Sequence, residues 1–449
     1  MRHTPAGEPC WTPADRDPAR IPAAPVPPHR VRGVLTADVT VVGAGLAGLA
    51  TAYYLADRNP SLDILVADAE RPAAGASGRG TGLLGPRVGP AIDKAVRLYG
   101  PSTARRMYLA SVDAVDRVVE LCARLGTPCG LRTGEQLVAS RAAPGLVALS
   151  RQAESYRSLG LDVPVLSAAG IHDRLDVPYH AGLLYRSATL DPAALSGALA
   201  RACAAKGVRF FGNSPLLAIR SSAAATGGGK GATQLVFPGG TVWTRKAVLA
   251  VNAAAGSLGL PVGTVLPLRV HAIATAPLAT EAREALGGRT GCALIDAHPL
   301  APYFRLSHDG RLVMGGGRTV LATAPDRACS TGVWGWLEER LRLLHPNVSE
   351  VQVTHRWSGT IGMTGDGLPV VGPLPGSPDV WYIGGCCGHG LAMSVAHGAH
   401  TAAMLDGGDA AHQLPWHRSQ APRIPVRGPA RALLRAHLRM LERGARRAA

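Results

Sequence analysis

The stretch ADVTVVGAGLAGLATAYYL (residues 37–55) decides the fold, and DILVAD (residues 63–68) completes it. The apolar run VTVV predicts a strand, and the glycines after it open a helical pattern. The second apolar run ends at Asp68, twenty residues after Gly48. A strand, a glycine turn, a helix and an acid at this spacing predict a Rossmann unit that binds a dinucleotide.

Each glycine of this motif has its own task. Gly43 allows the tight turn, Gly45 lets a pyrophosphate approach the main chain, and Gly48 lets helix and strand pack closely. The positive end of the helix then faces the phosphates, and the carboxylate binds a ribose hydroxyl. The predicted contacts are Gly43, Ala44, Gly45, Leu46, Ala47, Gly48 and Asp68.

A second match to the glycine pattern lies at residues 80–85. Because the chain has 55 glycines, a chance match is expected roughly once per chain. This match follows a loop and lacks both the strand before it and the acid after it. We interpret it as fortuitous and expect Gly82→Ala to cost less cofactor binding than Gly45→Val.

The composition is that of a globular protein. With 449 residues, 47% of them hydrophobic, the chain is long enough for two interlocked domains. It has no run of 18 apolar residues, so no membrane-spanning helix is predicted. Residues 1–33 contain eight prolines and no apolar signal-peptide core, which predicts a disordered or extended lead.

The eight cysteines form no CxxC pair, and Cys386 and Cys387 are adjacent. These spacings suit neither a shared metal nor an ordinary disulfide. We therefore expect no metal site, small buried side chains at the adjacent pair, and a reducing, cytoplasmic location.

The net charge of +16 raises the question of nucleic acid binding. Half of the charge falls in residues 418–449, which hold nine arginines and one glutamate. Arg431, Arg435, Arg439 and Arg443 are spaced by four and predict a basic face of an amphipathic helix. We expect residues 411–449 to form a basic tail that docks on its own protein. Peripheral contact with an acidic membrane is the alternative, and nucleic acid is the least favoured partner.

The hydrophobic pattern also predicts elements outside the Rossmann unit. Residues 264–320 are typical of antiparallel strands, with a hairpin turned at Asp309-Gly310. Helices are expected over residues 92–125, 144–159 and 331–344, after Asp191-Pro192, and after Gly390.

Several blocks, taken in order, resemble the D-amino-acid oxidase superfamily of FAD enzymes. After the Rossmann unit come a GASGR loop, an LDP helix start, a YFR…DGR hairpin, a TxDGxP turn and a GGxxGHG loop. They stand at Gly75–Gly82, Leu190–Leu195, Tyr303–Arg311, Thr364–Gly372 and Gly384–Gly390. The resemblance covers roughly residues 35–410 and is strongest to the branch of gamma-glutamylputrescine oxidoreductase, which also has a Pro-rich lead with a tryptophan (Trp11 in this chain).

This resemblance implies a tightly bound FAD in an α/β fold, with a discontinuous Rossmann-type FAD-binding domain and an antiparallel-sheet substrate domain. One Rossmann unit with two further glycine loops suits a large flat flavin better than a nicotinamide. We expect the FAD-binding domain at residues 34–100, 180–262 and 355–410, and the substrate domain at residues 101–179 and 263–354.

By resemblance, the second glycine loop passes along the pyrophosphate and the isoalloxazine. The third opens the last helix, whose positive end can stabilise the anionic edge of reduced flavin. His389 is the first catalytic candidate and Arg79 the second; a structural hydrogen bond and a surface turn are the alternatives. The implied FAD contacts are Ala76, Ser77, Gly78, Arg79, Gly80, Thr81, Gly82, Leu216, Gly388, His389, Gly390 and Leu391.

Three positions depart from relatives within the superfamily. Ile361 stands where sarcosine oxidases carry the cysteine that links FAD, and where glycine oxidases carry an arginine that binds the substrate carboxylate. Arg79 or Gly80 replaces a linking histidine, and Val313 or Met314 replaces an oxygen-activating lysine. The departures imply a noncovalent FAD, favour an amine over a simple α-amino acid, and argue against rapid reaction with oxygen.

We therefore expect an FAD-dependent oxidoreductase that oxidises the C–N bond of an amine to an imine, which water hydrolyses to an aldehyde or keto acid. Dioxygen or another acceptor takes the electrons. An amino-acid or N-methyl-amino-acid (sarcosine- or glycine-like) oxidase is the nearest alternative. The alternative of another class is a non-redox FAD-binding protein with an RNA or acidic partner, supported only by the basic tail.

Four other side chains are interpreted as structural first. Asp366 is expected to be a turn residue rather than a catalytic base, and Trp357 a core residue. Arg305 and Arg318 are expected to be structural or exposed, with contact to an anionic substrate as the second interpretation.

Overall fold

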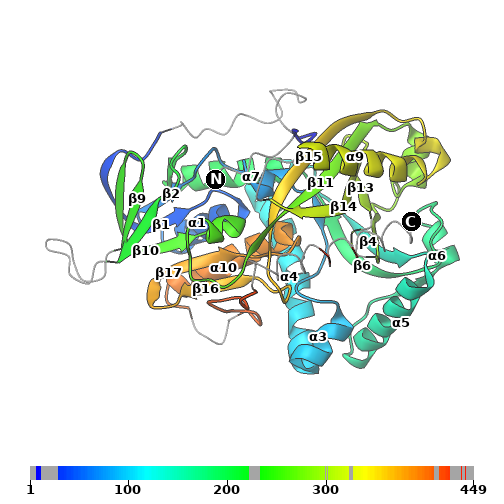
Figure 1. Cartoon of the computed structure of the whole chain (residues 1–449), viewed down its shortest axis with the longest axis horizontal. Coiled ribbons are helices and arrows are strands. Elements are labelled where there is room, and N and C mark those ends of the chain that lie inside the picture. Colours follow the sequence, from blue (N-terminus) through cyan, green and yellow to red (C-terminus); the bar gives the residue numbers. More distant parts are fainter. Residues whose placement is uncertain are drawn as a thin grey trace.

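The computed structural model describes residues 7–11, 29–221, 233–298, 300, 302–322, 327–408, 414–424, 436 and 440. These residues contain two β-sheets. Figure 1 shows the sheet of β1, β2 and β10 in one half of the molecule and the sheet of β4, β6, β11 and β14 in the other. The strand β15 (Val353–Met363) arches between the halves.

The first sheet has a parallel centre. Within the described residues it has eight strands, with β16, β17, β10, β1, β2 and β7 side by side and a β8–β9 hairpin added at β10. Residues 39–42 of β1 pair in parallel with β2 on one side and with β10 on the other. The strands are β1 (Gly33–Val42), β2 (Ile64–Ala67), β7 (Arg209–Phe211), β8 (Ala218–Ser221), β9 (Thr233–Phe237), β10 (Gly240–Leu249), β16 (Val370–Leu374) and β17 (Ser377–Gly384).

The second sheet is mostly antiparallel. The described residues give it nine strands in the order β15, β11, β14, β13, β12, β4, β6, β3, with β5 paired to β6. Its hairpin between β13 and β14 turns at Asp309-Gly310, as predicted, and Gly310 takes a φ of 80°. The strands other than β15 are β3 (Leu83–Leu84), β4 (Arg132–Ser140), β5 (Val165–Ser167), β6 (Ala181–Thr189), β11 (Leu266–Pro277), β12 (Ala293–Asp296), β13 (Tyr303–Leu306) and β14 (Arg311–Leu321).

Helices pack against both sheets. The first sheet packs against α1, α4, α7 and α10 through its alternate side chains. The second packs against α6, α8 and α9 on one face, and α5 covers β4 and β6 on the other. The helices are α1 (Leu46–Arg58), α2 (Ala76–Arg79), α3 (Ile92–Tyr99), α4 (Pro101–Leu125), α5 (Ala143–Ser158), α6 (Ala168–His172), α7 (Pro192–Ala205), α8 (Thr280–Ala285), α9 (Arg327–Arg342) and α10 (Gly390–Leu405), with 3-10 turns η2 (Asn252–Gly256) and η3 (Pro346–Val348). Among the described helices, none is both long and apolar enough to cross a bilayer.

Local sequence explains where two of these helices begin. The side chain of Asp191 accepts the N–H groups of Ala193 and Ala194, and Pro192 takes the first helical position, so α7 starts there as predicted. The long helix predicted over residues 92–125 is broken instead at Gly100, whose φ of 79° ends α3 before α4 begins.

The α/β class is confirmed, and three elements lie in a different half from the one predicted. The strand β6 pairs with β4, and β15 pairs with β11, so both belong to the second sheet. The helix α4 packs against α7 and α10 in the core of the Rossmann half. The hydrophobic pattern predicted each of these elements but not the strands or helices that it packs against, because those neighbours lie far away in the sequence.

The described parts of both terminal segments pack on the rest of the protein. Of the predicted disordered or extended lead, residues 7–11 are described, and Trp11 is 2% exposed, so this part is better packed than the sequence indicates. Of the predicted basic tail, residues 414–424 pass the edge strand β16, where Arg418 bridges to Val371: Trp416 is buried and the guanidinium of Arg418 pairs with Asp366. Ala436 and Met440 are helical, and the arginine face of the predicted tail helix lies outside the described residues.

Candidate functional site

The first glycine loop has the geometry of a phosphate-binding turn. Gly43 has a φ of 107°, and a Cβ there would lie 2.5 Å from the carbonyl oxygen of Ala250. A Cβ on Gly48 would collide with the carbonyl of Gly43. Gly45 is the N-cap of α1 and brings no side chain, so apart from the N–H of Leu46, which Ser77 accepts, the first N–H groups of this helix can bind an outside acceptor.

Asp68 is fixed at the tip of β2, beside this loop. One carboxylate oxygen accepts the N–H of Ala44 at 2.6 Å and the other accepts the N–H of Glu70 at 2.8 Å. Burial raises the pKa of Asp68, while these two hydrogen bonds favour its ionised form. The carboxylate therefore stands where the Rossmann pattern places the ribose acceptor.

The second glycine loop lies against the first. The hydroxyl of Ser77 in α2 accepts the N–H of Leu46 at 2.8 Å, and the N–H of Ala73 donates to the carbonyl of Ala44 at 3.0 Å. A Cβ on Gly45 would lie 3.0 Å from the Ser77 hydroxyl. The structure thus brings α2 to the positive end of α1, so the two predicted cofactor-binding loops form one surface.

Arg79, at the end of α2, is held by main-chain carbonyls. Its Nε–H donates to the carbonyl of Ser358 at 2.7 Å, and its guanidinium also donates to the carbonyl of Gly7. The indole N–H of Trp357 donates to the carbonyl of Arg79 at 3.0 Å. Burial lowers the pKa of Arg79 from its ordinary value. This geometry favours an anchoring role for Arg79 over the predicted catalytic one.

A buried cation fixes the next part of the loop. Arg305 is 2% exposed, and its guanidinium donates to the carbonyls of Thr81 at 2.7 Å and Leu190 at 2.9 Å. It therefore clamps the loop, as the structural interpretation of this arginine expected. The side chain of Arg318, the other arginine considered on sequence, lies outside the described residues.

Gly82 lies under this clamp. It has a φ of 82°, and a Cβ there would collide with the carbonyl of Leu190 and the guanidinium of Arg305. The second glycine pattern is indeed no Rossmann turn, since residues 80–85 lead from α2 into the short strand β3. The expectation that Gly82→Ala costs less cofactor binding than Gly45→Val took no account of this packing, which requires a glycine here for a reason other than the motif.

The third glycine loop runs from β17 into α10. Cys386 is buried, and Cys387 has a φ of 52° and donates its N–H to the carbonyl of Gly362 at 3.0 Å. His389 is the N-cap of α10, and its N–H donates to the carbonyl of Cys386 at 2.9 Å. The helix therefore begins beside His389, as predicted.

His389 is neutral. Burial, and then the positive charge of Arg87, lower the pKa of His389 to about 3. A protonated imidazole is therefore not expected at this position at neutral pH. The positive end of α10 supplies the favourable potential instead.

The strand β15 brings the second and third loops together. Gly359 faces Arg79, whose Cβ lies 3.4 Å from the position a Cβ on Gly359 would take. Two residues on, the Cδ1 of Ile361 lies 4.0 Å from the corresponding position on Gly388. Because few other atoms approach Gly388, the space beside it can admit a ligand edge.

The same face of the second sheet carries polar side chains that sequence reasoning missed. Strand pairing places Gln136 beside Tyr185 and Tyr303 beside Gly315, over which the Tyr303 ring lies. Burial raises the pKa of Tyr303, so its phenol stays protonated. Gln136 is 6% exposed and rests on Gly85. Only the strand alternation of these residues was visible in the sequence.

The remaining predicted contacts lie at the margins of this surface. Leu216 is buried behind β2 in the cluster that holds Leu65 and Ala67, and Ser214 two residues earlier donates its N–H to the carbonyl of Asp68. Leu391 is half-buried and packs against the core of the Rossmann half. Neither side chain is brought to the space beside Gly388.

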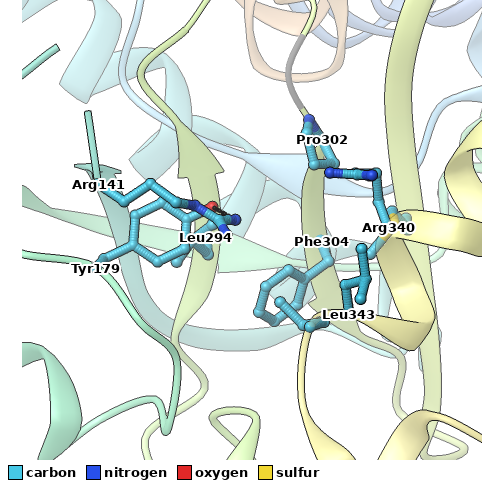
Figure 2. A pocket seen from close by; sticks show the side chains of 9 residues that line it. Arg141, Tyr179, Leu294, Pro302, Phe304, Arg340 and Leu343 are labelled. Carbon is cyan, nitrogen blue, oxygen red and sulfur yellow. Dashed lines mark hydrogen bonds between the residues drawn. The ribbon is translucent and has the colours of Figure 1, made fainter. Parts of the chain in front are cut away.

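A cavity on the other face of the second sheet is a separate feature. Figure 2 shows Arg141 and Tyr179 together on one side of it, with Arg340 and Leu343 on the other. Its volume of about 20 Å³ suits a single water molecule. Its lining residues Leu294 and Phe304 belong to the core beneath α9, so the sheet separates this cavity from the glycine loops.

Comparison with known families agrees with this geometry. Residues 38–404 match the family DAO, FAD dependent oxidoreductase. The chain belongs to this family. As a DAO-family enzyme it is an FAD-dependent oxidoreductase.

Curated relatives and solved structures extend the comparison. The probable oxidoreductase OrdL of Haemophilus influenzae is 25% identical over 83% of this chain and 84% of its own length. Gamma-glutamylputrescine oxidoreductase of Escherichia coli is 27% identical over 83% and 84%. The crystal structure of glycine oxidase from Geobacillus kaustophilus superposes with a TM-score of 0.70 at 21% identity, covering 85% of this chain and 97% of that one, and shows the shared fold.

The residues present fit the cofactor of the DAO family. The uncapped start of α1 suits the pyrophosphate, the pinned carboxylate of Asp68 suits the ribose, and the space beside Gly388 suits the flat ring. Each of these features comes from a different part of the chain, and α2 and β15 join them.

Proposed function

We propose that this DAO-family enzyme oxidises the C–N bond of an amine to an imine, which water then hydrolyses. The observation that carries the proposal is the meeting of the second and third glycine loops at β15, which leaves space beside Gly388 next to the uncharged side chain of Ile361. Bound FAD supplies the acceptor for the hydride that leaves the carbon next to nitrogen. Dioxygen or another acceptor takes up these two electrons.

The side chains at the third glycine loop and on the same face of the second sheet suit a neutral amine. His389 is uncharged, and the Tyr303 phenol is protonated and able to donate a hydrogen bond. An amine that arrives without its proton needs no strong base to become oxidised, and the described wall offers none. Ile361 cannot form a bond to the flavin, which supports noncovalent FAD.

Anaerobic mixing with a panel of amines tests this function. An amine substrate bleaches the yellow flavin in one turnover, and acid precipitation of the same protein releases all the flavin into the supernatant. Bleaching by 2-hydroxy acids but by no amine or amino acid would contradict the proposal, and flavin retained on the pellet would contradict noncovalent binding.

Oxidation of an amino acid is the second candidate, and one observation favours it. Arg87 is exposed in the loop between β3 and α3, and its charge acts on His389, Tyr156 and Tyr185. A cation at this place can attract a substrate carboxylate, although the position of the glycine oxidase arginine is held by Ile361.

Arg87→Ala separates the two candidates. If the substrate carries a carboxylate, KM is expected to rise about tenfold with little change in kcat, because a charge-assisted hydrogen bond contributes roughly 1.5–3 kcal/mol. Steady-state kinetics with a matched amine and amino acid measures this. Arg106→Ala, which removes an exposed arginine from α4, is the control. Unchanged KM for both substrates would exclude a binding role for Arg87.

The alternative of another class depends on the basic tail. Its arginine face lies outside the described residues, so binding of RNA or an acidic partner is a separate hypothesis. Comparing the salt-dependent RNA shift of the full chain with that of a chain ending at residue 424 tests it. The cytoplasmic location likewise stays a prediction.

A further inference from the structure

Residues 7–11 form a segment that we call the N-terminal strap, and it lies on β15. In Figure 1 this short blue segment is seen beside β15, far from the rest of the blue chain. Gly7 has a φ of 67°, and a Cβ on it would collide with the carbonyl of Arg356. Cys10 and Trp11 are 4% and 2% exposed. The strap is therefore packed as core, although its composition suggested a loose lead.

Trp11 binds the end of α2. Its indole N–H donates to the carbonyl of Gly78 at 2.8 Å. The neighbouring indole of Trp357 donates to the carbonyl of Arg79, and the two rings meet edge to face with centroids 5.4 Å apart. The last carbonyls of a helix have no partner inside it. Two adjacent tryptophans thus satisfy the last two carbonyls of α2.

The strap also reaches the two arginines that hold this loop. The carbonyl of Gly7 accepts a hydrogen bond from the guanidinium of Arg79. The guanidinium of Arg305, which clamps Thr81, lies 5.6 Å from the centre of the Trp11 ring, at cation–π distance. Gly7 and Trp11 of the strap therefore contact Gly78, Arg79 and the clamping residue Arg305.

The short helix α2 needs such outside support. It has four residues, Ala76–Arg79, too few to form a stable helix alone. Its Ser77 must nevertheless stand at the N-terminus of α1, where the hydroxyl accepts the N–H of Leu46. A displacement of α2 by one or two ångströms would break this hydrogen bond and move the loop from the pyrophosphate position.

We propose that the N-terminal strap fixes α2 in its FAD-binding position, with Trp11 as the positioning residue. The indole N–H of Trp11 holds the carbonyl end of α2, and its ring packs between Trp357 and Arg305. The proposal depends on FAD binding, which the DAO family establishes, and not on the proposed amine chemistry. A failure of the amine assay therefore leaves it standing.

Trp11→Phe tests the proposal with the least disturbance, because it keeps an aromatic ring and removes the N–H. We expect the dissociation constant of FAD, measured by titrating apoprotein, to rise about five- to tenfold, since one hydrogen bond is lost. The dissociation rate of FAD should rise by a similar factor, and the visible circular dichroism of the bound flavin should change.

Tyr179→Phe is the matched control. It removes a buried hydroxyl that donates to Asp296 and accepts from Arg141, so it costs at least as many hydrogen bonds as Trp11→Phe, but on the other face of the second sheet. It should lower the melting temperature of the apoprotein about as much as Trp11→Phe and change FAD affinity less than twofold. Equal FAD affinities in the two variants, with equal melting temperatures, would reduce the strap to a structural role and overturn the proposal.

The double variant Trp11→Phe/Trp357→Phe tests whether the two indoles support the same helix. Trp357→Phe frees the carbonyl of Arg79, and because both indoles hold the same short helix, the losses of FAD affinity in Trp11→Phe and Trp357→Phe should not add. Additive losses would show that the two tryptophans act on separate structures, which contradicts a single positioning device.

Discussion

Gly82→Ala is expected to purify colourless, with FAD affinity lowered at least about a hundredfold or with the fold lost. The left-handed backbone alone costs an alanine roughly 1–2 kcal/mol. The added Cβ must also displace either the carbonyl of Leu190 or the buried guanidinium of Arg305, which holds the flavin loop. Absorbance of bound flavin at purification and thermal unfolding of the apoprotein measure the two parts of this effect.

Two glycines provide controls for this variant. Gly75→Ala changes the same loop at a φ of −79°, where no atom lies within 4 Å of the new Cβ, so it should stay yellow. Gly126→Ala introduces a similar positive φ of 59° in open surroundings and isolates the cost of the backbone conformation. A yellow Gly82→Ala protein with the melting temperature of the parent would contradict the clamp.

His389→Ala is expected to purify yellow and to reduce its flavin at least tenfold more slowly. Removing the ring takes a polar group from the start of α10, while the Rossmann contacts at α1 and Asp68 are left intact. Each tenfold loss of rate corresponds to about 1.4 kcal/mol of transition-state stabilisation. Anaerobic stopped-flow reduction by a substrate amine measures the rate.

The pH dependence of this effect follows from the lowered pKa of His389. A group with a pKa of about 3 stays neutral throughout the range from pH 6 to pH 9. The ratio of parent to variant rates should therefore be flat across that range. His180→Ala, which removes an exposed histidine before β6, is the control. A ratio that steps near pH 6.5 would show that His389 titrates, and equal rates would make it structural.

The parts of the site that sequence predicts are the local ones. Gly43, Gly48 and Asp68 were recognised because the turn, the helix start and the acid lie within one β–α–β unit. The role of Gly82 was missed because its neighbours Leu190 and Arg305 are more than a hundred residues away. We compared Gly82 only with the Rossmann motif, whereas the packing of Leu190 and Arg305 against it is what requires a glycine at this position.

The same distinction explains what else the sequence did not reveal. The partners of Arg79, Ser358 and Gly7, are 279 and 72 residues away, where no spacing rule connects them. The surroundings that lower the pKa of His389 could not be inferred from its two flanking glycines. Sheet membership of β6 and β15 also depended on long-range pairing.

The pairing of Trp11 with Trp357 has a consequence for biosynthesis. The two rings are separated by 346 positions along the chain. At about 5–20 residues per second, the ribosome takes roughly 20 to 70 s to deliver the second ring after the first. Throughout that interval the nascent Rossmann unit carries α2 with one of its two indole supports missing. The full support of α2 can therefore form only after residue 357 has been synthesised, and tight uptake of the yellow cofactor is expected to follow the synthesis of β15.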